Sequence, residues 1–257
     1  MMHQKSGNKM REYATAPVAA AAVAACLLIE PSAHGAIAAS LVGRIEGRVE
    51  TCAFNPALGW DSNAASSPLA LSAFQNDFEQ SNGNPFRSWA LELGPTVDGG
   101  AVYIFDPIDL PGGGIAGARA VVLRDLFARW IDPSTERVAG GTEGRAATAA
   151  AFQLAVWEIA NENFGTNDAA TLVSRMSMTT GAFRALASAE TAARYAAMTA
   201  TLGVGGFRSH ELEVLANPVA QDQVRVVPAP AAVIVLLGGA LGACHSRRRR
   251  APGVRVG

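Results

Sequence analysis

The stretch RAATAAAFQLAVWEIANEN, residues 145–163, decides how the chain folds. It is rich in alanine and contains neither glycine nor proline, a composition that favours an α-helix. Helical spacing places Gln153 on one face with Val156, Trp157 and Ala160, which predicts a buried glutamine. A buried amide must be hydrogen-bonded, because an unpaired one costs about 1–3 kcal/mol. Glu158 lies on a different face, where we expect it to be solvated or paired within the first turns of the helix.

The residues on either side of this helix predict an α+β fold, with a β-rich N-terminal half packed against a helical C-terminal half. Residues 40–54 alternate apolar and polar side chains, and residues 101–105 form a second β-rich run. The Ser, Asn, Gly and Pro residues between these runs indicate loops. Further helices are predicted at 117–132 and 181–203, and final strands at 212–217 and 222–227.

Three glycines, Gly112, Gly114 and Gly117, match the spacing of a dinucleotide-binding loop, and Asp132 follows at a suitable distance. That chemistry requires the glycines to lie directly between a strand and a helix. Here the segment DPIDLP intervenes, so we interpret the glycines as a loop and not as a nucleotide site. Asp106 and Asp109 in that segment are expected to cap turns and not to bind calcium.

The charge pattern argues against nucleic-acid binding and against histidine chemistry. Between residues 39 and 227 there are thirteen arginines, no lysine and twenty acidic residues, a net charge of about −7. His210 is the only histidine in this range, which excludes a multi-histidine metal site, and no nucleophile-elbow motif accompanies it. We therefore expect neither an enzyme nor a cofactor, and a secreted hydrolase is disfavoured.

Residues 1–38 are typical of a secretory signal peptide. Lys5, Lys9 and Arg11 precede an apolar run over 14–29, and small residues follow it. Cleavage is expected after Ala38, with a second possible site after Gly35. Two alternatives are an uncleaved membrane helix and lipoprotein processing at Cys26.

The C-terminus contains three consecutive sorting features. Val227, Pro228 and Pro230 form a proline motif, an apolar segment extends to about residue 243, and Arg247, Arg248, Arg249 and Arg250 follow. A basic cluster behind an apolar segment stays in the cytoplasm, so the preceding domain faces outward. This arrangement resembles the PEP-CTERM sorting signal, in its V-P-x-P-A variant with Ala229 in place of glutamate. The resemblance implies an exosortase-type sorting enzyme as partner, in bacteria that make extracellular polysaccharide; the alternative is an ordinary tail anchor.

These features divide the chain into a signal peptide (1–38), an exported domain (39–227), a sorting signal (228–250) with a short transmembrane helix, and a cytoplasmic tail (251–257). Cys26 and Cys244 lie in the terminal segments, so the exported domain keeps one cysteine, Cys52. The expected location is the membrane or cell surface, or the extracellular matrix after processing.

The segment TCAF around Cys52, followed later by Q-x-A-x-W on a helix, resembles the thioester domains of bacterial surface adhesins. The resemblance implies an internal thioester in which Cys52 supplies the sulfur and Gln153 the acyl carbon, with release of ammonia. Phe152 and Trp157 match the apolar residue and the tryptophan of the glutamine motif and would line a dry pocket, whereas Thr51 departs from the aromatic or leucine that usually precedes the cysteine.

Two functional hypotheses result from these patterns. The first is an exported surface protein that attaches covalently to amine or hydroxyl ligands through the Cys52–Gln153 thioester. The second is a structural component of the polysaccharide matrix without reactive chemistry. In the second, Cys52 is a small buried hydrophobic residue and Gln153 is a core amide bonded to the backbone.

Overall fold

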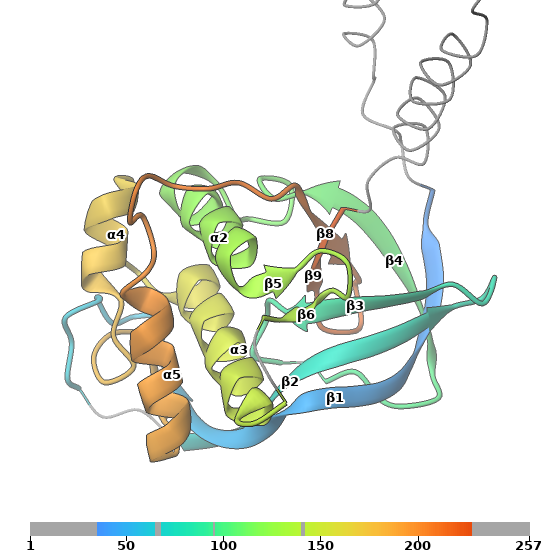
Figure 1. The fold of residues 1–257 in the computed structure, drawn as a ribbon, viewed down its shortest axis with the longest axis horizontal. Helices are drawn as coiled ribbons and strands as arrows, with labels where there is room; N and C mark the ends of the chain where they lie inside the picture. Colours follow the sequence, from blue (N-terminus) through green and yellow to red (C-terminus); the bar gives the residue numbers. More distant parts are fainter. Residues whose placement is uncertain (1–34, 65–67, 95, 140–141, 228–257) are drawn as a thin grey trace, which may run out of the picture. The chain divides into compact units, whose positions relative to one another are not determined.

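The computed structural model describes residues 35–64, 68–94, 96–139 and 142–227 (Figure 1). The predicted signal peptide up to residue 34 and the sorting signal from Pro228 onward lie outside the described residues. No helix in the part of the chain that the structure describes is both long enough and apolar enough to cross a membrane.

The described body combines strands and helices, so the predicted mixed α+β class is confirmed, with more strand than the sequence suggested. The strands are β1 (Ile37–Phe54), β2 (Pro68–Gln80), β3 (Pro85–Ala90), β4 (Val102–Asp109), β5 (Ile131–Asp132), β6 (Arg137–Val138), β7 (Phe183–Leu186), β8 (Leu212–Ala216) and β9 (Gln223–Val226). The helices are α2 (Gly117–Trp130), α3 (Arg145–Asn161), α4 (Ala169–Arg175) and α5 (Ala189–Thr199).

Six antiparallel strands close into a small barrel. The sheet order is β2-β3-β9-β8-β4-β1-β7, and an additional pairing between β1 and β2 completes the ring. Its interior is a small apolar cluster to which Leu41, Phe78, Phe86, Phe105 and Leu215 contribute from five different strands. Closure removes the unpaired edges that an open sheet of these strands would expose.

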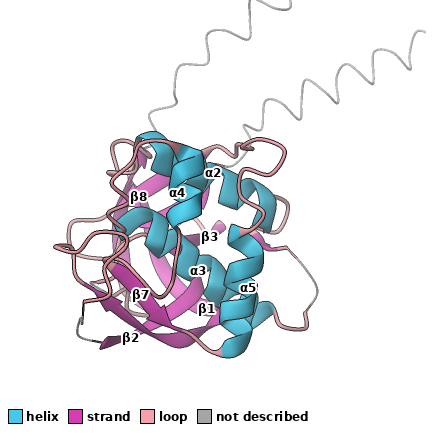
Figure 2. Ribbon diagram, turned by 90° about the vertical axis from the view of Figure 1, so that its left-hand side faces the viewer, coloured by secondary structure: helices cyan, strands magenta, loops and turns pink. Residues whose placement is uncertain are grey.

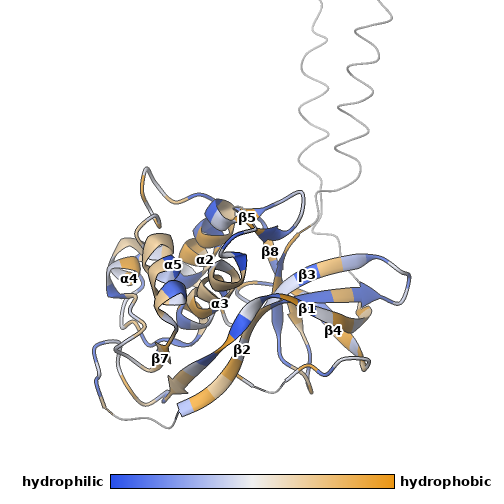
Figure 3. Ribbon diagram, turned by 60° about the horizontal axis from the view of Figure 1, so that its bottom comes forward, coloured by the Kyte–Doolittle hydropathy of each residue, from blue (hydrophilic) through white to orange (hydrophobic). Residues whose placement is uncertain are grey.

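The strands β1 and β2 continue beyond the barrel as a two-stranded ribbon (Figure 3). Their register shifts at two places in β1, and Gly47 at the second shift has φ +140°. A Cβ on Gly47 would lie 2.3 Å from the carbonyl oxygen of Ala73, so only glycine fits there. The ribbon end of β1 pairs with β7 on its other side.

The four helices gather on one side of the strands (Figure 2). Helix α3 is at the centre, and every residue from Ala147 to Ile159 is buried. A helix that is apolar on all sides needs neighbours on all sides. It packs on β1, β2 and β3 and against α2 and α5, around the larger of the two apolar clusters.

Two predicted assignments are wrong. Residues 68–90 are not loops but contain β2 and β3, whose polar residues, such as Gln75 and Asn76, are buried between layers. Residues 181–203 are not one helix, because the strand β7 occupies 183–186 and α5 begins after Ser188. Pairing of this segment with β1 overrides its alanine-rich helical propensity.

Candidate functional site

The Gln153 side chain bonds the backbone of one residue at the end of β3. Its Oε1 accepts a hydrogen bond from the Ala90 backbone N–H at 3.1 Å, and its Nε2 donates to the Ala90 carbonyl oxygen at 2.7 Å. Gln153 is fully buried, as predicted. These two hydrogen bonds are the contacts that the second interpretation from the sequence, a core amide bonded to the backbone, expects for this residue.

The register of the sheet explains why Ala90 needs a side chain as its partner. Strands β2 and β3 pair only from Asn76↔Ser88 to Glu79↔Pro85, and β3 then continues alongside β9. In an antiparallel pair, alternate residues direct their backbone groups to the same neighbour, so those of Ala90, two residues after Ser88, point toward β2. Because β2 diverges there, the Gln153 amide occupies the position that a backbone peptide of β2 would have taken.

The two aromatic residues predicted to flank Gln153 have different surroundings. Phe152 lies in the core, with its ring centroid 4.5 Å from that of Trp89 and 5.0 Å from that of Phe127. Trp157 packs edge-on against Phe183, with ring centroids 6.4 Å apart. Its side chain is buried, and its Nε1 has no hydrogen-bond partner among the residues that the structure describes. Trp157 also lines a cavity of about 80 Å³ between β2 and the segment after β3.

Cys52 lies in the ribbon part of β1, between Leu69 of β2 and Ala185 of β7. It is buried and lines a largely apolar groove of about 370 Å³ together with Pro68, Met178 and Leu186. Burial, with a smaller contribution from the Glu50 carboxylate, raises the pKa of the Cys52 thiol to about 12. The thiol is therefore protonated at neutral pH and a poor nucleophile.

Cys52 and Gln153 thus have separate partners in the structure. The Gln153 amide is held by Ala90, and Gln153 is not among the residues that line the groove beside Cys52. In the described part of the chain, no hydrogen bond joins the Cys52 sulfur to the Gln153 amide. The predicted thioester between them stays a prediction.

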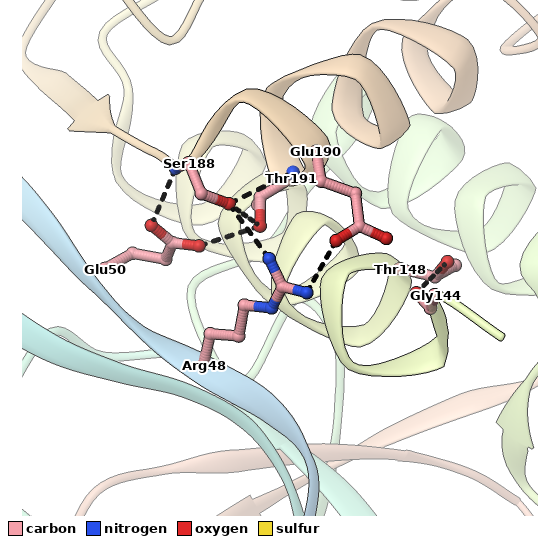
Figure 4. A network of polar contacts seen from close by, with 7 residues as sticks. All are labelled: Arg48, Glu50, Gly144, Thr148, Ser188, Glu190 and Thr191. Carbon is pink, nitrogen blue, oxygen red and sulfur yellow. Dashed lines mark hydrogen bonds and ion pairs between the residues drawn. The ribbon is translucent and has the colours of Figure 1, made fainter. Parts of the chain in front are cut away.

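Glu50, two residues before Cys52, fixes the N-terminus of α5 to β1 (Figure 4). Its buried carboxylate accepts hydrogen bonds from the Ser188 backbone N–H at 3.1 Å and from the Thr191 hydroxyl at 2.8 Å. Ser188 also caps the helix through Thr191 N–H. A carboxylate at a helix N-terminus is favourable because the macrodipole is positive there.

Arg48 adds an exposed arm to this network (Figure 4). It donates to Ser188 Oγ at 3.2 Å and to Glu190 at 2.6 Å. Because both side chains are exposed, we assign this ion pair little stabilisation. The hydrogen bond from Ser188 to Glu50 joins two residues that are 138 positions apart in sequence. The network therefore has a structural role, because it holds the start of α5 against β1.

Glu158 in α3 and Glu162, which caps the C-terminus of that helix, are both buried. This contradicts the expectation that Glu158 is solvated or paired within the first turns of the helix. Glu158 accepts a hydrogen bond from Ser177 N–H through one oxygen, and its other oxygen has no partner in the described part of the chain. Glu162 accepts from Asn163 N–H and from Phe183 N–H. Burial, opposed by the Ser177 hydrogen bond, raises the pKa of Glu158 to about 8. The lack of a polar face on this helix is the sequence signal that could have predicted burial.

The glycine-rich turn needs one correction. Strand β4 extends to Asp109, so the glycines do lie between a strand and a helix. The neighbours of β4 are antiparallel, however, whereas the dinucleotide motif belongs to parallel βαβ units. Asp109 accepts a hydrogen bond from Gly112 N–H at 2.8 Å, which confirms its predicted role in a turn.

Comparisons of the chain with models of known protein families, with curated proteins and with solved structures gave no match.

Proposed function

We propose that this chain is an exported structural protein of the bacterial cell surface or extracellular polysaccharide matrix, sorted by its C-terminal segment. The observation that carries the proposal is the succession of a proline motif, an apolar segment and four arginines over residues 227–250. Its partners would be an exosortase-type enzyme during sorting and polysaccharide or another surface ligand afterwards.

The described domain supports a structural role without reactive chemistry. The Cys52 thiol is buried with a raised pKa, and the Gln153 amide has both of its hydrogen bonds supplied by Ala90. Each of the two residues thus has a structural role that requires no thioester.

The position of β1 favours one of the two expected cleavage sites of the signal peptide. The strand begins at Ile37, which pairs with Phe105, and the Ala38 carbonyl accepts a hydrogen bond from Ser81 N–H at 2.9 Å. Cleavage after Ala38 would remove these contacts, whereas cleavage after Gly35 leaves β1 whole. We therefore expect the mature chain to begin at Ala36, which N-terminal sequencing of the secreted protein checks; a start at Ala39, as cleavage after Ala38 would give, or beyond would contradict it.

Deleting residues 228–257 in the native host tests the sorting proposal. We expect the truncated chain to appear in the medium and to be lost from the cell-surface and matrix fractions. A matched variant with Arg247–Arg250 replaced by glutamine keeps the apolar segment and should also be mislocalised. An unchanged distribution of both variants would refute the proposal.

A further inference from the structure

A small cavity lies where β2 and β3 separate, next to Trp157. Its volume is about 80 Å³, and its polar lining comes from Arg44, Ser72, Asn76, Thr96, Trp157 and Gln221. This is room for a few atoms heavier than hydrogen, too little for a whole sugar but enough for one small polar group.

Trp157, one of the residues that line the cavity, has a buried hydrogen-bond donor with no partner among the described residues. Trp157 is 2% exposed, and its Nε1 bonds to nothing in the described residues. An indole N–H can only donate, so its missing partner must be an acceptor. Leaving such a group unpaired in the interior is unfavourable, so an acceptor beside it would be stabilised.

The neighbouring edge of β2 adds backbone N–H and C=O groups on the side of the cavity. Alternate residues of a strand point their backbone groups to opposite sides. The registers of β1 with β2 and β7, and of β2 with β3, therefore place the backbone groups of Ala70 and Ser72 on the side away from β1, where β3 no longer pairs with β2. Both residues line the cavity. The Ser72 hydroxyl lines it too and can donate a further hydrogen bond.

The charge at the cavity is positive. Arg44 is exposed at its mouth and uses Nη2 to donate to the Val97 carbonyl at 2.8 Å, which leaves its Nε and Nη1 donors for a ligand. No aspartate or glutamate is among the described residues that line the cavity. An unpaired indole N–H and one guanidinium, with no carboxylate among the described lining residues, fit an anionic oxygen group and disfavour a metal ion.

We propose that this cavity binds a carboxylate group, held by the Trp157 indole N–H and the Arg44 guanidinium. The carboxylate would belong to a small organic acid or to an acidic sugar whose ring stays outside. Binding of an acidic sugar would extend the proposed matrix role and depends on that role, because acidic sugars are components of polysaccharides. Binding of a small organic acid does not depend on it.

The test is an NMR titration of the ¹⁵N-labelled full chain in mild detergent. The chain has four tryptophans, and the indole signal that disappears in Trp157→Phe belongs to Trp157. Sodium acetate and sodium glucuronate should each shift that signal saturably, with a Kd on the order of millimolar. Glucose, and sodium chloride at matched ionic strength, should not shift it.

Arg44 provides the matched variants. Arg44→Gln should weaken binding about tenfold, because it removes the charged hydrogen-bond donor, while Arg44→Lys keeps a cation and should keep most of the affinity. Equal affinities for acetate and glucuronate would identify a small-acid site, and tighter glucuronate binding would identify an acidic-sugar site. Either outcome supports the proposal.

Three results would overturn it: no shift of the Trp157 signal, an equal shift with glucose, or unchanged affinity in Arg44→Gln. The first would mean that water alone fills the cavity. None of these results bears on sorting, because the deletion of residues 228–257 measures location without using the cavity.

Discussion

The two ends of the β1–β2 pair hold their neighbours in different ways. At the barrel end, β2 pairs with β3 through the ladder from Asn76 to Glu79, and backbone satisfies backbone. At the ribbon end, β3 no longer pairs with β2, and the Gln153 amide bonds the backbone of Ala90 in β3 instead. The comparison teaches that one side chain from a helix can replace a strand where a sheet opens.

The barrel end should be most sensitive to loss of apolar volume. Phe78 is fully buried, with ring centroids 5.2 Å from Phe86 and 5.5 Å from Phe105. We expect Phe78→Ala to lower the free energy of unfolding by about 3–5 kcal/mol. Denaturant unfolding measures this, and a loss below about 1 kcal/mol would show that the barrel interior is not a packed core.

The ribbon end should be most sensitive to loss of a single amide. Gln153→Leu keeps the size of the side chain but leaves both backbone groups of Ala90 unpaired, and we expect a loss of about 2–4 kcal/mol. Gln153→Glu is the matched control, because it retains an acceptor for the Ala90 N–H and should cost less below the pKa of the new carboxyl. Equal stability of Gln153→Leu and the parent chain would disprove the role of the amide.

Glu158, in the helix α3 that packs on β1 and β2, should make the free energy of unfolding depend on pH. Its folded pKa of about 8 exceeds the ordinary value of 4.5, so the folded state holds a proton that the unfolded state releases between these values. Glu158 makes its full contribution to the free energy of unfolding below about pH 4.5. That contribution falls by on the order of 1 kcal/mol per pH unit as the pH rises, and it is lost by about pH 8.

Glu158→Gln should remove that slope while keeping an acceptor for Ser177 N–H. The difference in unfolding free energy between the variant and the parent should therefore grow with pH over this window and then level off. Parallel pH profiles for the two chains would contradict the raised pKa.

The exposed arm of the α5 network should matter least. Arg48→Ala removes the pair with Glu190 and should cost less than about 1 kcal/mol, less still in high salt. A thermal melt at two ionic strengths is sufficient to measure it. A loss as large as that of Gln153→Leu would mean that the pair is more than a surface contact.

The sequence predicted the elements whose local pattern and packing agree. Helices α2 and α3, the strand β1 and the last two strands were found close to their predicted places, and the burial of Gln153 followed from helical spacing. β2, β3 and β7 were missed because their pairing with distant strands, and not their own composition, makes them strands. Ala90 as the partner of Gln153 depends on where β2 and β3 diverge, which no local pattern records.

Intact-mass measurement of the purified chain tests the role of Gln153 most directly. If the amide completes the β3 ladder, it must be present, because its Nε2 donates to Ala90. We predict the full unmodified mass of the mature chain, with a Cys52 thiol that is alkylated only after unfolding because its pKa is about 12. A mass lower by one ammonia, restored to the unmodified value for the variant by Cys52→Ala, would instead establish the thioester and contradict the account.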